Sequence, residues 1–463
     1  MTDQDDFDRA LSERLRAHEA RLPGGTAPDL AAVGSGSVPE RRAWGWGALV
    51  AAGGVAAGLL LVLFLGGRLQ PPTGQASATP RPTPSAIESP SASALTDPSP
   101  TPSDQEQLSL IPIAGLGGDD EMRAIIDVDG RLIGVGRRGD QGAVWTSPDG
   151  ASWTLAPDLP VSEPVEYAAT TMTSIVQGPS GLVAVGTWQT IDFSTPRIWH
   201  STDGQRWTSV YVPSGFERID ALTVGGPGYV AAGLVSDDGF TGRPQVWTSA
   251  DGRDWTARDS QGLTANVNDV IGGAGLLVAV GGGGTAAGAF VSSDGTTWTA
   301  APEQEALQGA ALTSVAFRNG AFVAGGALTG PGDTFPSTPA IWHSRDGLHW
   351  SLVLQGGSLL RISQVVTAED GFVAIGGHFP SAGWSYDPAD PIPPSDTIQL
   401  WFSADGETWS GPTTGFLADG GISTIGRATF WEGDLLVSVT LLSGGPDGPV
   451  YQSAILRGPL PVE

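Results

Sequence analysis

The sequence predicts an all-β fold built from repeats, and three observations lead to that prediction. A nine-residue segment starts at Trp145 and returns at Trp199, Trp247, Phe290, Trp342 and Trp401. Every copy follows the pattern aromatic-x-Ser-x-Asp-Gly-x-x-Trp, in which Asp-Gly is typical of a turn between two strands. Glycine (67 residues) and proline (36 residues) are abundant and stand between short apolar runs, which is typical of a fold with many turns. Recurrence at six places indicates a repeat architecture.

Residues 1–42 are expected on the cytoplasmic side of a membrane. Apolar side chains recur there at helical spacing and predict a short amphipathic helix that ends before Pro23. These side chains are Phe7, Leu11, Leu15 and Leu22. Two interpretations stay open: a helix that lies beside the membrane, or a docking helix for an intracellular partner.

Residues 43–67 form an apolar stretch without a charged residue. At about 1.5 Å of rise per residue, a helix of this length crosses a hydrocarbon core of about 30 Å. Arg41 and Arg42 precede the stretch and only Arg68 follows it, so the excess of positive charge predicts a cytoplasmic N-terminus. We therefore expect a single-pass protein of the cell membrane with an extracytoplasmic C-terminal domain.

Residues 68–106 are rich in Pro, Ser, Thr and Ala and contain few large apolar side chains. Such a segment buries too little apolar surface to offset the loss of chain entropy on folding. The sequence predicts a disordered stalk at 68–106, followed by a folded domain at 107–463.

The unit repeated in the folded domain consists of four predicted strands. A mixed strand such as Thr173-Ser-Ile-Val comes first, and an apolar strand that stops at glycine, such as Leu182-Val-Ala-Val-Gly, comes second. The aromatic strand, the Asp-Gly turn and the Trp strand complete the unit. Small residues in the second strand suit a blade packed between two neighbours. The closing Trp residues are 43 to 59 positions apart, which suits propeller blades with loop insertions.

A seventh unit is predicted after the sixth nonamer. Strands are expected at 422–425, 435–439 and 451–456, but no Trp strand follows them. The segment at 108–113 precedes the first unit and can supply the missing edge. We therefore predict a seven-bladed β-propeller of four-stranded blades, preceded by one transmembrane helix. Pairing between the two ends of the domain closes the ring and removes exposed sheet edges.

The nonamer resembles the Asp-box of the sialidase-type (BNR) repeat family, whose Ser-x-Asp-x-Gly-x-x-Trp motif marks the hairpin between the third and fourth strands of a blade. The box is one residue shorter here, because its Asp and Gly are adjacent. They are Asp149 and Gly150 in the first copy, and the corresponding residues are adjacent in the other copies too. The resemblance covers the whole repeat domain and implies a propeller with Asp-box-like hairpins. Catalytic and non-catalytic propellers share such boxes. The Phe/Tyr-Arg-Ile-Pro signature of sialidases is missing, and Pro196-Arg-Ile-Trp is the nearest string, so the chain resembles a non-catalytic member.

The composition excludes several kinds of chemistry. The net charge is −26 and all 23 basic residues are arginine; an acidic surface repels phosphate backbones, so no nucleic-acid partner is expected. The absence of lysine excludes Schiff-base chemistry, and the absence of cysteine excludes thiol nucleophiles and thiolate-bound metals. We expect no cofactor and no metal. His200 and His343, at equivalent repeat positions, are interpreted as framework residues, and Asp127 to Gly130 as a plain turn.

The candidate ligand-binding residues are predicted on the face opposite the Asp-Gly hairpins. Because antiparallel strands alternate in direction, the loops from second to third strands and from blade to blade share that face. The first strands should line the central channel and place charged residues near its mouth, and a long loop at 378–397 adds aromatic side chains. The candidates are Arg123, Glu217, Arg218, Asp220, Asp269, Arg361, Trp384 and Tyr386.

These residues support three hypotheses about function. Arginines around one mouth attract a carboxylate, and the resemblance implies the same, since sialidases use three arginines in this way. The sequence favours a non-enzymatic propeller that binds a glycan or protein ligand outside the membrane, and we assign no catalytic residue. The first alternative is an anchored exo-glycosidase of the sialidase kind. The second is transmembrane signalling through residues 1–42.

Overall fold

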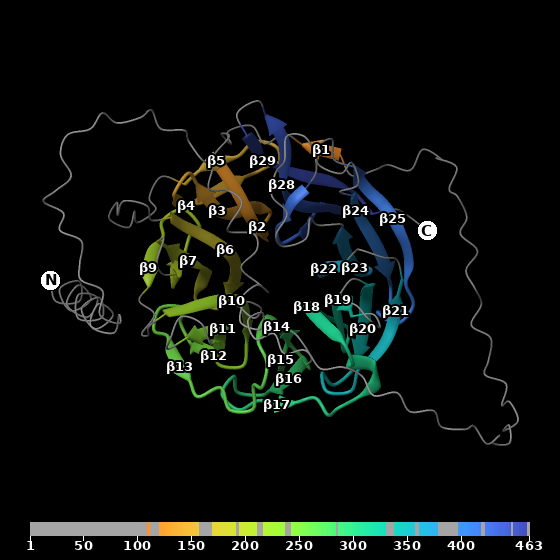
Figure 1. Ribbon diagram of the computed structural model, residues 1–463. Coiled ribbons are helices and arrows are strands. Elements are labelled where there is room, and N and C mark those ends of the chain that lie inside the picture. Colours follow the sequence, from red (N-terminus) through yellow and green to blue (C-terminus); the bar gives the residue numbers. More distant parts are fainter. Residues whose placement is uncertain are drawn as a thin grey trace, which may run out of the picture. The chain divides into compact units, whose positions relative to one another are not determined.

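A computed structural model shows the repeat domain as a ring of seven blades (Figure 1). The first strand of each complete blade lies nearest the ring axis, and the short strand after the Asp-Gly hairpin lies on the outer rim (Figure 1). The predicted all-β propeller with seven blades is therefore confirmed. The structure describes residues 109–111, 120–156, 169–190, 194–210, 216–236, 242–283, 286–329, 338–356, 361–377, 397–417, 422–445 and 448–460.

Six blades are four-stranded antiparallel sheets whose strands follow one another along the chain. Blade 1 contains β2 (Asp120–Val128), β3 (Arg131–Arg138), β4 (Gln141–Ser147) and β5 (Thr154–Leu155). Blade 2 contains β6 (Ala169–Gly178), β7 (Gly181–Gln189), β8 (Ser194–Ser201) and β9 (Thr208–Val210). Blade 3 contains β10 (Phe216–Gly225), β11 (Gly228–Ser236), β12 (Gly242–Ser249) and β13 (Thr256–Arg258).

The next three blades repeat this order. Blade 4 contains β14 (Val267–Gly273), β15 (Leu276–Gly283), β16 (Ala286–Ser292) and β17 (Thr299–Ala300). The short 3-10 helix η3 (Glu305–Leu307) follows it. Blade 5 contains β18 (Ala310–Arg318), β19 (Ala321–Leu328), β20 (Thr338–Ser344) and β21 (Ser351–Gln355). Blade 6 contains β22 (Arg361–Ala368), β23 (Gly371–Gly377), β24 (Thr397–Ser403) and β25 (Ser410–Leu417).

The seventh blade is assembled from both ends of the domain. β26 (Ile422–Ile425) and β27 (Thr429–Trp431) both pair with β28 (Asp434–Gly445), which pairs with β29 (Gly448–Pro459). β1 (Ser109–Ile111) then pairs antiparallel with β29. The prediction that the segment before the first blade supplies the missing outer strand is therefore confirmed.

The hydrophobic core is divided into seven clusters, one at each interface between neighbouring blades. At the interface that closes the ring, Trp145 and Trp153 of blade 1 pack with Trp431 and Ile455 of blade 7. All four side chains are buried. Removing these large apolar surfaces from water stabilises the contact between the first blade and the last.

Each inner strand has a one-residue bulge directly after a buried apolar residue. In blades 1–6 a glycine of the second strand lies opposite that bulge. A Cβ atom at Gly233 would stand 1.7 Å from the Arg218 carbonyl oxygen, so no larger residue fits there. The bulged residues are Arg123, Thr173, Asp220, Asn268, Thr313, Ser363 and Ser423.

The repeated Asp-Gly segment forms the hairpin between the third and fourth strands of blades 1–6. In blade 1 the Gly150 N–H donates to Ser147 Oγ (2.8 Å), and the N–H groups of Ala151 and Ser152 donate to Asp149 Oδ1 (2.9 and 2.7 Å). The backbone bonds from Ser152 and Ala151 lower the pKa of Asp149 to about 2. Gly150 has a φ of +72°, which glycine adopts without strain. The Asp and Ser side chains therefore shape the hairpin, and the same bonds recur in the other five copies.

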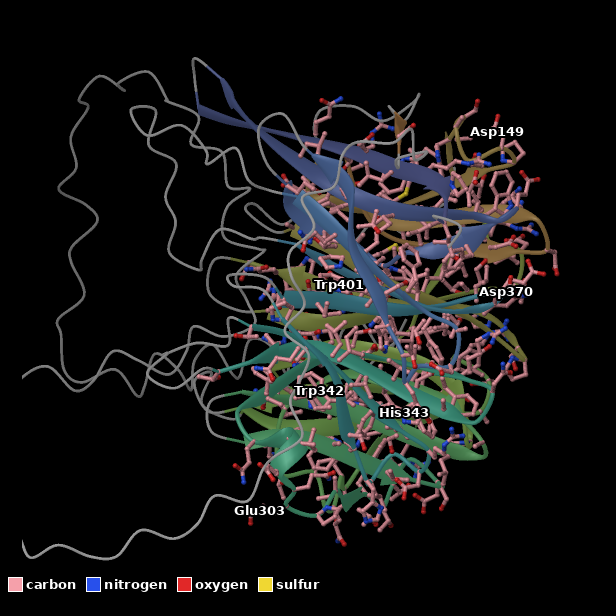
Figure 2. The ribbon with its side chains drawn as sticks, turned by 90° about the vertical axis from the view of Figure 1, so that its right-hand side faces the viewer. Asp149, Glu303, Trp342, His343, Asp370 and Trp401 are labelled. Atoms are coloured by element: carbon pink, nitrogen blue, oxygen red, sulfur yellow. The ribbon has the colours of Figure 1, made fainter. Side chains whose placement is uncertain are left out.

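The two faces of the ring differ in what they carry. Asp149, in a hairpin, and Asp370, in a turn between first and second strands, lie on the same face (Figure 2). Glu303, in the connection from blade 4 to blade 5, lies toward the opposite side (Figure 2). We call the first the hairpin face and the second the loop face. Antiparallel pairing requires this separation.

The predicted amphipathic helix, the membrane helix at 43–67 and the stalk at 68–106 lie outside the described residues. Within the parts of the chain that are described, no helix has the length and apolar character needed to cross a lipid bilayer.

Candidate ligand-binding site at the channel entrance

The inner strands begin on the loop face, and their first residues form what we call the channel entrance. Arg218 and Arg361 stand two positions before the bulge of their strands, and Glu121 holds that place in blade 1. Arg123 and Asp220 are themselves bulged residues, of blades 1 and 3. The structure therefore puts these predicted residues at matching register positions of different blades.

The other predicted residues divide into two groups. Asp269 directly follows the bulge of blade 4 and is buried. Glu217 belongs to β10, but its side chain is outside the described part of the structure, and so are Trp384 and Tyr386 entirely. Their roles stay predictions.

Arg123 lies in a buried charged cluster that joins blades 1 and 7. Glu121 forms ion pairs with Arg123 (2.6 Å) and Arg137 (2.7 Å), and Thr440 Oγ1–H donates to the same carboxylate (3.3 Å). Burial would raise the pKa of Glu121, but the two guanidinium groups outweigh it and hold that pKa below its usual value. Glu121 is therefore a fixed anion near neutral pH.

Arg218 and Asp220 form a second pair, within one strand of blade 3. Arg218 Nε lies 2.7 Å from Asp220 Oδ1 and 3.0 Å from Oδ2. Burial raises the pKa of Asp220, and the neighbouring guanidinium opposes that rise. Among the carboxyl groups at the channel entrance, Asp220 is therefore the one that is protonated more readily than an ordinary aspartate.

Asp269 uses both carboxylate oxygens to connect three blades. Oδ1 accepts from Arg427 (3.0 Å), and Oδ2 accepts from Ser314 Oγ–H (3.2 Å) and the Val315 N–H (3.0 Å). Ser314 and Val315 belong to blade 5, whereas Arg427 comes from blade 7, on the other side of the ring (Figure 1). The ion pair therefore crosses the central channel.

Arg427 can reach across because blade 7 has an insertion in its first strand. The insertion shows in the number of positions between the residue that precedes the bulge and the start of the second strand. In blade 1 these two residues are Met122 and Arg131, nine positions apart, and blades 2–6 have the same spacing. In blade 7 the spacing is twelve positions, from Ile422 to Asp434. The three additional residues, 426–428, separate β26 from β27.

The backbone N–H groups of the insertion donate hydrogen bonds to acceptors in three blades. Gly426 N–H donates to the Ser438 carbonyl of blade 7 and Arg427 N–H to the Arg123 carbonyl of blade 1, both at 2.8 Å. Ala428 N–H donates to Gln364 Oε1 of blade 6, also at 2.8 Å. Residues 426–428 therefore form a fixed element inside the channel.

Sequence reasoning missed Glu121, Arg137, Arg427 and Thr440. The longer spacing in blade 7 was a readable signal for the insertion, because six units keep the shorter value. No local signal marks the other three, since Arg137 and Thr440 reach Glu121 from other strands.

His200 and His343 occupy equivalent ends of third strands, opposite Val183 and Val323. His200 is buried, with Nε2 3.0 Å from the Ser180 carbonyl and Nδ1 accepting from Arg253 Nε (3.3 Å). Both roles belong to the framework. Among the described residues, no group of three His, Asp or Glu side chains is placed to hold a metal ion.

In comparison with known proteins, the chain is similar to others in its fold alone. No protein-family model matches the chain, and no curated protein matches its sequence. An endosialidase of phage phi92 is 10% identical over 76% of this chain and 69% of its own, with a TM-score of 0.42. Virginiamycin B lyase of Staphylococcus aureus is 8% identical over 77% and 100%, with a TM-score of 0.48. The arabinanase of Bacillus subtilis is 10% identical over 76% and 95%, with a TM-score of 0.31. These proteins are structural neighbours of the chain, and the Asp-box family stays a resemblance.

Proposed function

We propose that this chain is a membrane-anchored, extracytoplasmic propeller that binds a glycan or protein ligand at the channel entrance without catalysis. The apolar stretch at 43–67 is the proposed anchor, and residues 68–106 are the proposed tether. Both rest on composition and length.

The observation that supports binding best is the pairing of charged groups at the entrance. Arg123 is held by Glu121 at 2.6 Å and Arg218 by Asp220 at 2.7 Å. Guanidinium groups held this way present their other N–H donors in fixed directions, which suits ligand hydroxyl, carbonyl or carboxylate oxygens. Glu121, with its lowered pKa, has no proton to give at neutral pH and is a poor general acid.

A binding assay with the full chain in detergent tests this proposal. The chain should bind members of a glycan and peptidoglycan-fragment array, and Arg361→Ala should weaken that binding about tenfold or more, since a charged hydrogen bond contributes about 1.5–3 kcal/mol. Arg206→Ala is the matched control, because Arg206 is exposed in a hairpin of blade 2. Absence of binding together with turnover of a fluorogenic sialoside would reverse the proposal.

The alternative function is an anchored exo-glycosidase, and the Asp220 environment favours it. A half-buried carboxyl with a raised pKa can donate a proton to a leaving group. If the chain turns over a fluorogenic glycoside, Asp220→Asn should reduce the rate about 100-fold or more. Turnover that is unchanged in Arg123→Ala, Arg218→Ala and Arg361→Ala would remove the basis for a sialidase-like site.

A third function, signalling through residues 1–42, follows from the helical spacing of apolar residues in that segment. A pull-down with residues 1–42 should recover a specific intracellular partner, and a segment with the four apolar residues changed to Ser should not. Recovery of the same proteins by both segments would count against signalling.

Protease digestion of intact cells should remove the propeller and spare the N-terminus.

A further inference from the structure

Arg427 reaches into the central channel from the insertion in blade 7. Its side chain extends to Asp269 of blade 4, on the other side of the ring, so the guanidinium group lies within the channel. The Arg427 side chain is 33% exposed to water. The exposed part of this cation therefore belongs to the lining of the channel.

The contact with Asp269 uses one donor of the guanidinium group. Arg427 Nη2 lies 3.0 Å from Asp269 Oδ1. Asp269 Oδ2 accepts instead from Ser314 Oγ–H and the Val315 N–H, so the arginine and the carboxylate do not form a pair of parallel hydrogen bonds. A guanidinium group has five N–H donors. Among the described residues, Asp269 is the one side chain bonded to this guanidinium, which leaves donors for a ligand in the channel.

The backbone of the insertion lies at the depth of the entrance residues. The Arg427 N–H donates to the Arg123 carbonyl (2.8 Å), and Arg427 forms a parallel bridge with Ala124. Gly426 is packed closely against blade 1, because a Cβ atom there would stand 2.5 Å from the Arg123 carbonyl oxygen. Arg123 is the bulged residue of its strand. A ligand at the channel entrance would therefore find Arg427 at the level of the bulges.

Arg427 also changes the balance of charge at this level. From two positions before the bulge to one position after it, the seven inner strands carry three arginines and three carboxylates. These residues are Arg123, Arg218 and Arg361, and Glu121, Asp220 and Asp269. Arg427 therefore leaves an excess of positive charge at the entrance of a chain whose net charge is −26. Such an excess favours an anionic group.

We propose that the guanidinium group of Arg427, which Asp269 holds in place, binds a carboxylate of the ligand. This inference rests on the proposed function, because it names a charged group of the ligand at the channel entrance. A guanidinium held in one orientation presents its remaining donors in a planar arrangement that matches the two oxygens of a carboxylate. An acidic sugar and an acidic peptide share this chemistry.

Modification by phenylglyoxal, a reagent for accessible guanidinium groups, tests the proposal on the unchanged full chain in detergent. Peptide mapping by mass spectrometry gives the rate at each arginine. The probes are D-glucuronate and the peptide acetyl-Gly-Glu-Gly-amide. Their neutral matches are D-glucose and acetyl-Gly-Gln-Gly-amide, measured at equal ionic strength.

A carboxylate probe should slow the modification of Arg427 in a saturable way, and its neutral match should not. The rate should fall about tenfold when the probe reaches about ten times its half-protecting concentration. The probe that protects at the lower concentration identifies the source of the carboxylate, sugar or peptide.

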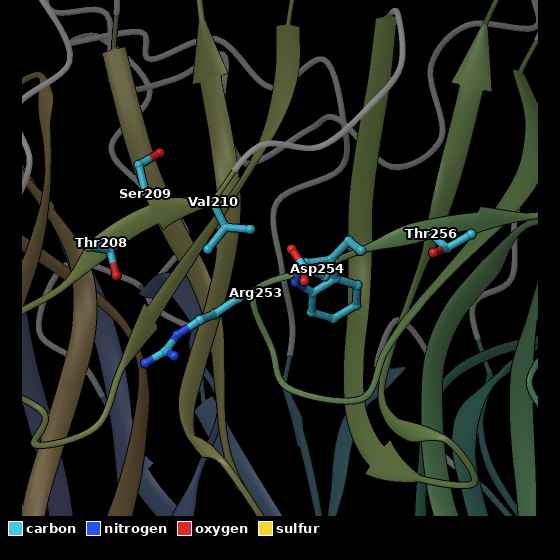
Figure 3. A pocket seen from close by; sticks show the side chains of 7 residues that line it. Thr208, Ser209, Val210, Arg253, Asp254 and Thr256 are labelled. Carbon is cyan, nitrogen blue, oxygen red and sulfur yellow. The ribbon is translucent and has the colours of Figure 1, made fainter. Parts of the chain in front are cut away.

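Arg253 is the matched control for this measurement. Its Nε also has a single partner, His200 Nδ1 (3.3 Å), and its side chain is exposed outside the channel. It lines a hollow of about 620 Å³ beside the outer strands of blades 2 and 3 (Figure 3). The modification rate of Arg253 should stay the same with every probe. Failure of both carboxylate probes to protect Arg427, or equal protection of Arg253, overturns the proposal.

Arg361→Ala separates this inference from the proposed function. That variant should lose binding to the glycan array, but the small carboxylate probe should still protect its Arg427, which belongs to a different blade. Protection of Arg427 without array binding by the unchanged chain would contradict the proposed function alone. Array binding with an unprotected Arg427 would contradict this inference alone.

Discussion

At the residue scale, His343 shows that equivalent positions of the repeat have different charged neighbours in different blades. It is 7% exposed, and its Nε2 lies 3.6 Å from Glu407 Oε1, which Arg345 also contacts at 2.7 Å. Burial lowers the pKa of His343; Glu407 and Asp405 oppose that effect and Arg345 adds to it. In blade 2 the equivalent His200 faces Arg253, a cation, in the place that Glu407 holds. One framework position therefore meets opposite charges in two blades.

The lowered pKa of His343 predicts a dependence of stability on pH. In the folded chain this imidazole binds fewer protons than in the unfolded chain, whose reference pKa is 6.5. Its contribution is therefore complete above that pH and is lost as the pH falls through and below it. Denaturant unfolding at pH about 7 and about 5 should show a smaller loss for His343→Gln than for the unchanged protein. Equal losses would contradict this account.

The glycine opposite each bulge predicts a steric effect on stability. Gly233→Ala would put Cβ 1.7 Å from the Arg218 carbonyl oxygen, so the strands must separate, at a cost of about 3 kcal/mol or more. Gly356→Ala is the control, because no atom lies within 4 Å of its added Cβ. Denaturant midpoints should fall for the first variant alone. A normal midpoint for Gly233→Ala would show that the bulge adapts.

At the element scale, the repeated hairpin is stabilised by its own polar side chains. In blade 4 the buried Ser292 accepts from the Gly295 N–H (2.9 Å) and donates to Asp294 Oδ1 (3.1 Å). The backbone N–H groups of Thr297 and Thr296 then lower the pKa of Asp294. The hairpin needs Ser for a buried acceptor and Asp for an exposed one, which explains their recurrence without a catalytic role.

Removing the buried acceptor should destabilise the fold. Ser292→Ala leaves the buried Gly295 N–H without its partner, which costs about 1–3 kcal/mol. Ser293→Ala changes an exposed residue of the same hairpin and should cost less than about 0.5 kcal/mol. Calorimetric unfolding of both variants checks the difference. Similar values for the two would rule out this role for Ser292.

At the scale of the whole molecule, the ring is held at its rim and through its centre. β1 adds the outer strand of blade 7, so the first described strand pairs with the last. The Arg427–Asp269 pair joins blades 7 and 4 across the channel. Because Asp269 is only 5% exposed and Arg427 33% exposed, the carboxylate depends on this partner more than the guanidinium does.

Breaking the cross-channel pair should therefore destabilise the ring. Arg427→Met leaves Asp269 buried with its charge uncompensated, at a cost of about 3 kcal/mol, the low end for buried pairs because Arg427 is partly exposed. Adding Asp269→Asn should recover most of that loss, since the amide carries no charge. A double-mutant cycle by denaturant unfolding measures the coupling. Additive losses would show that the pair contributes nothing beyond its separate residues.

The sequence alone determined the strands, the hairpins, the number of blades and the closing role of the segment before blade 1. These features depend on local turn chemistry and on a repeat that can be counted, and the unpaired edge of the seventh unit required a strand from elsewhere. It also located the inner-strand starts that carry Arg123, Arg218, Asp220 and Arg361.

Only the tertiary structure decided which charged groups meet. Arg427 and Asp269 are 158 positions apart, and Glu121 and Thr440 are 319 positions apart. Ion pairs depend on distances of a few ångströms, which closure of the ring creates between strands of different blades. Local patterns specify the blades, but the contacts between blades specify the candidate sites.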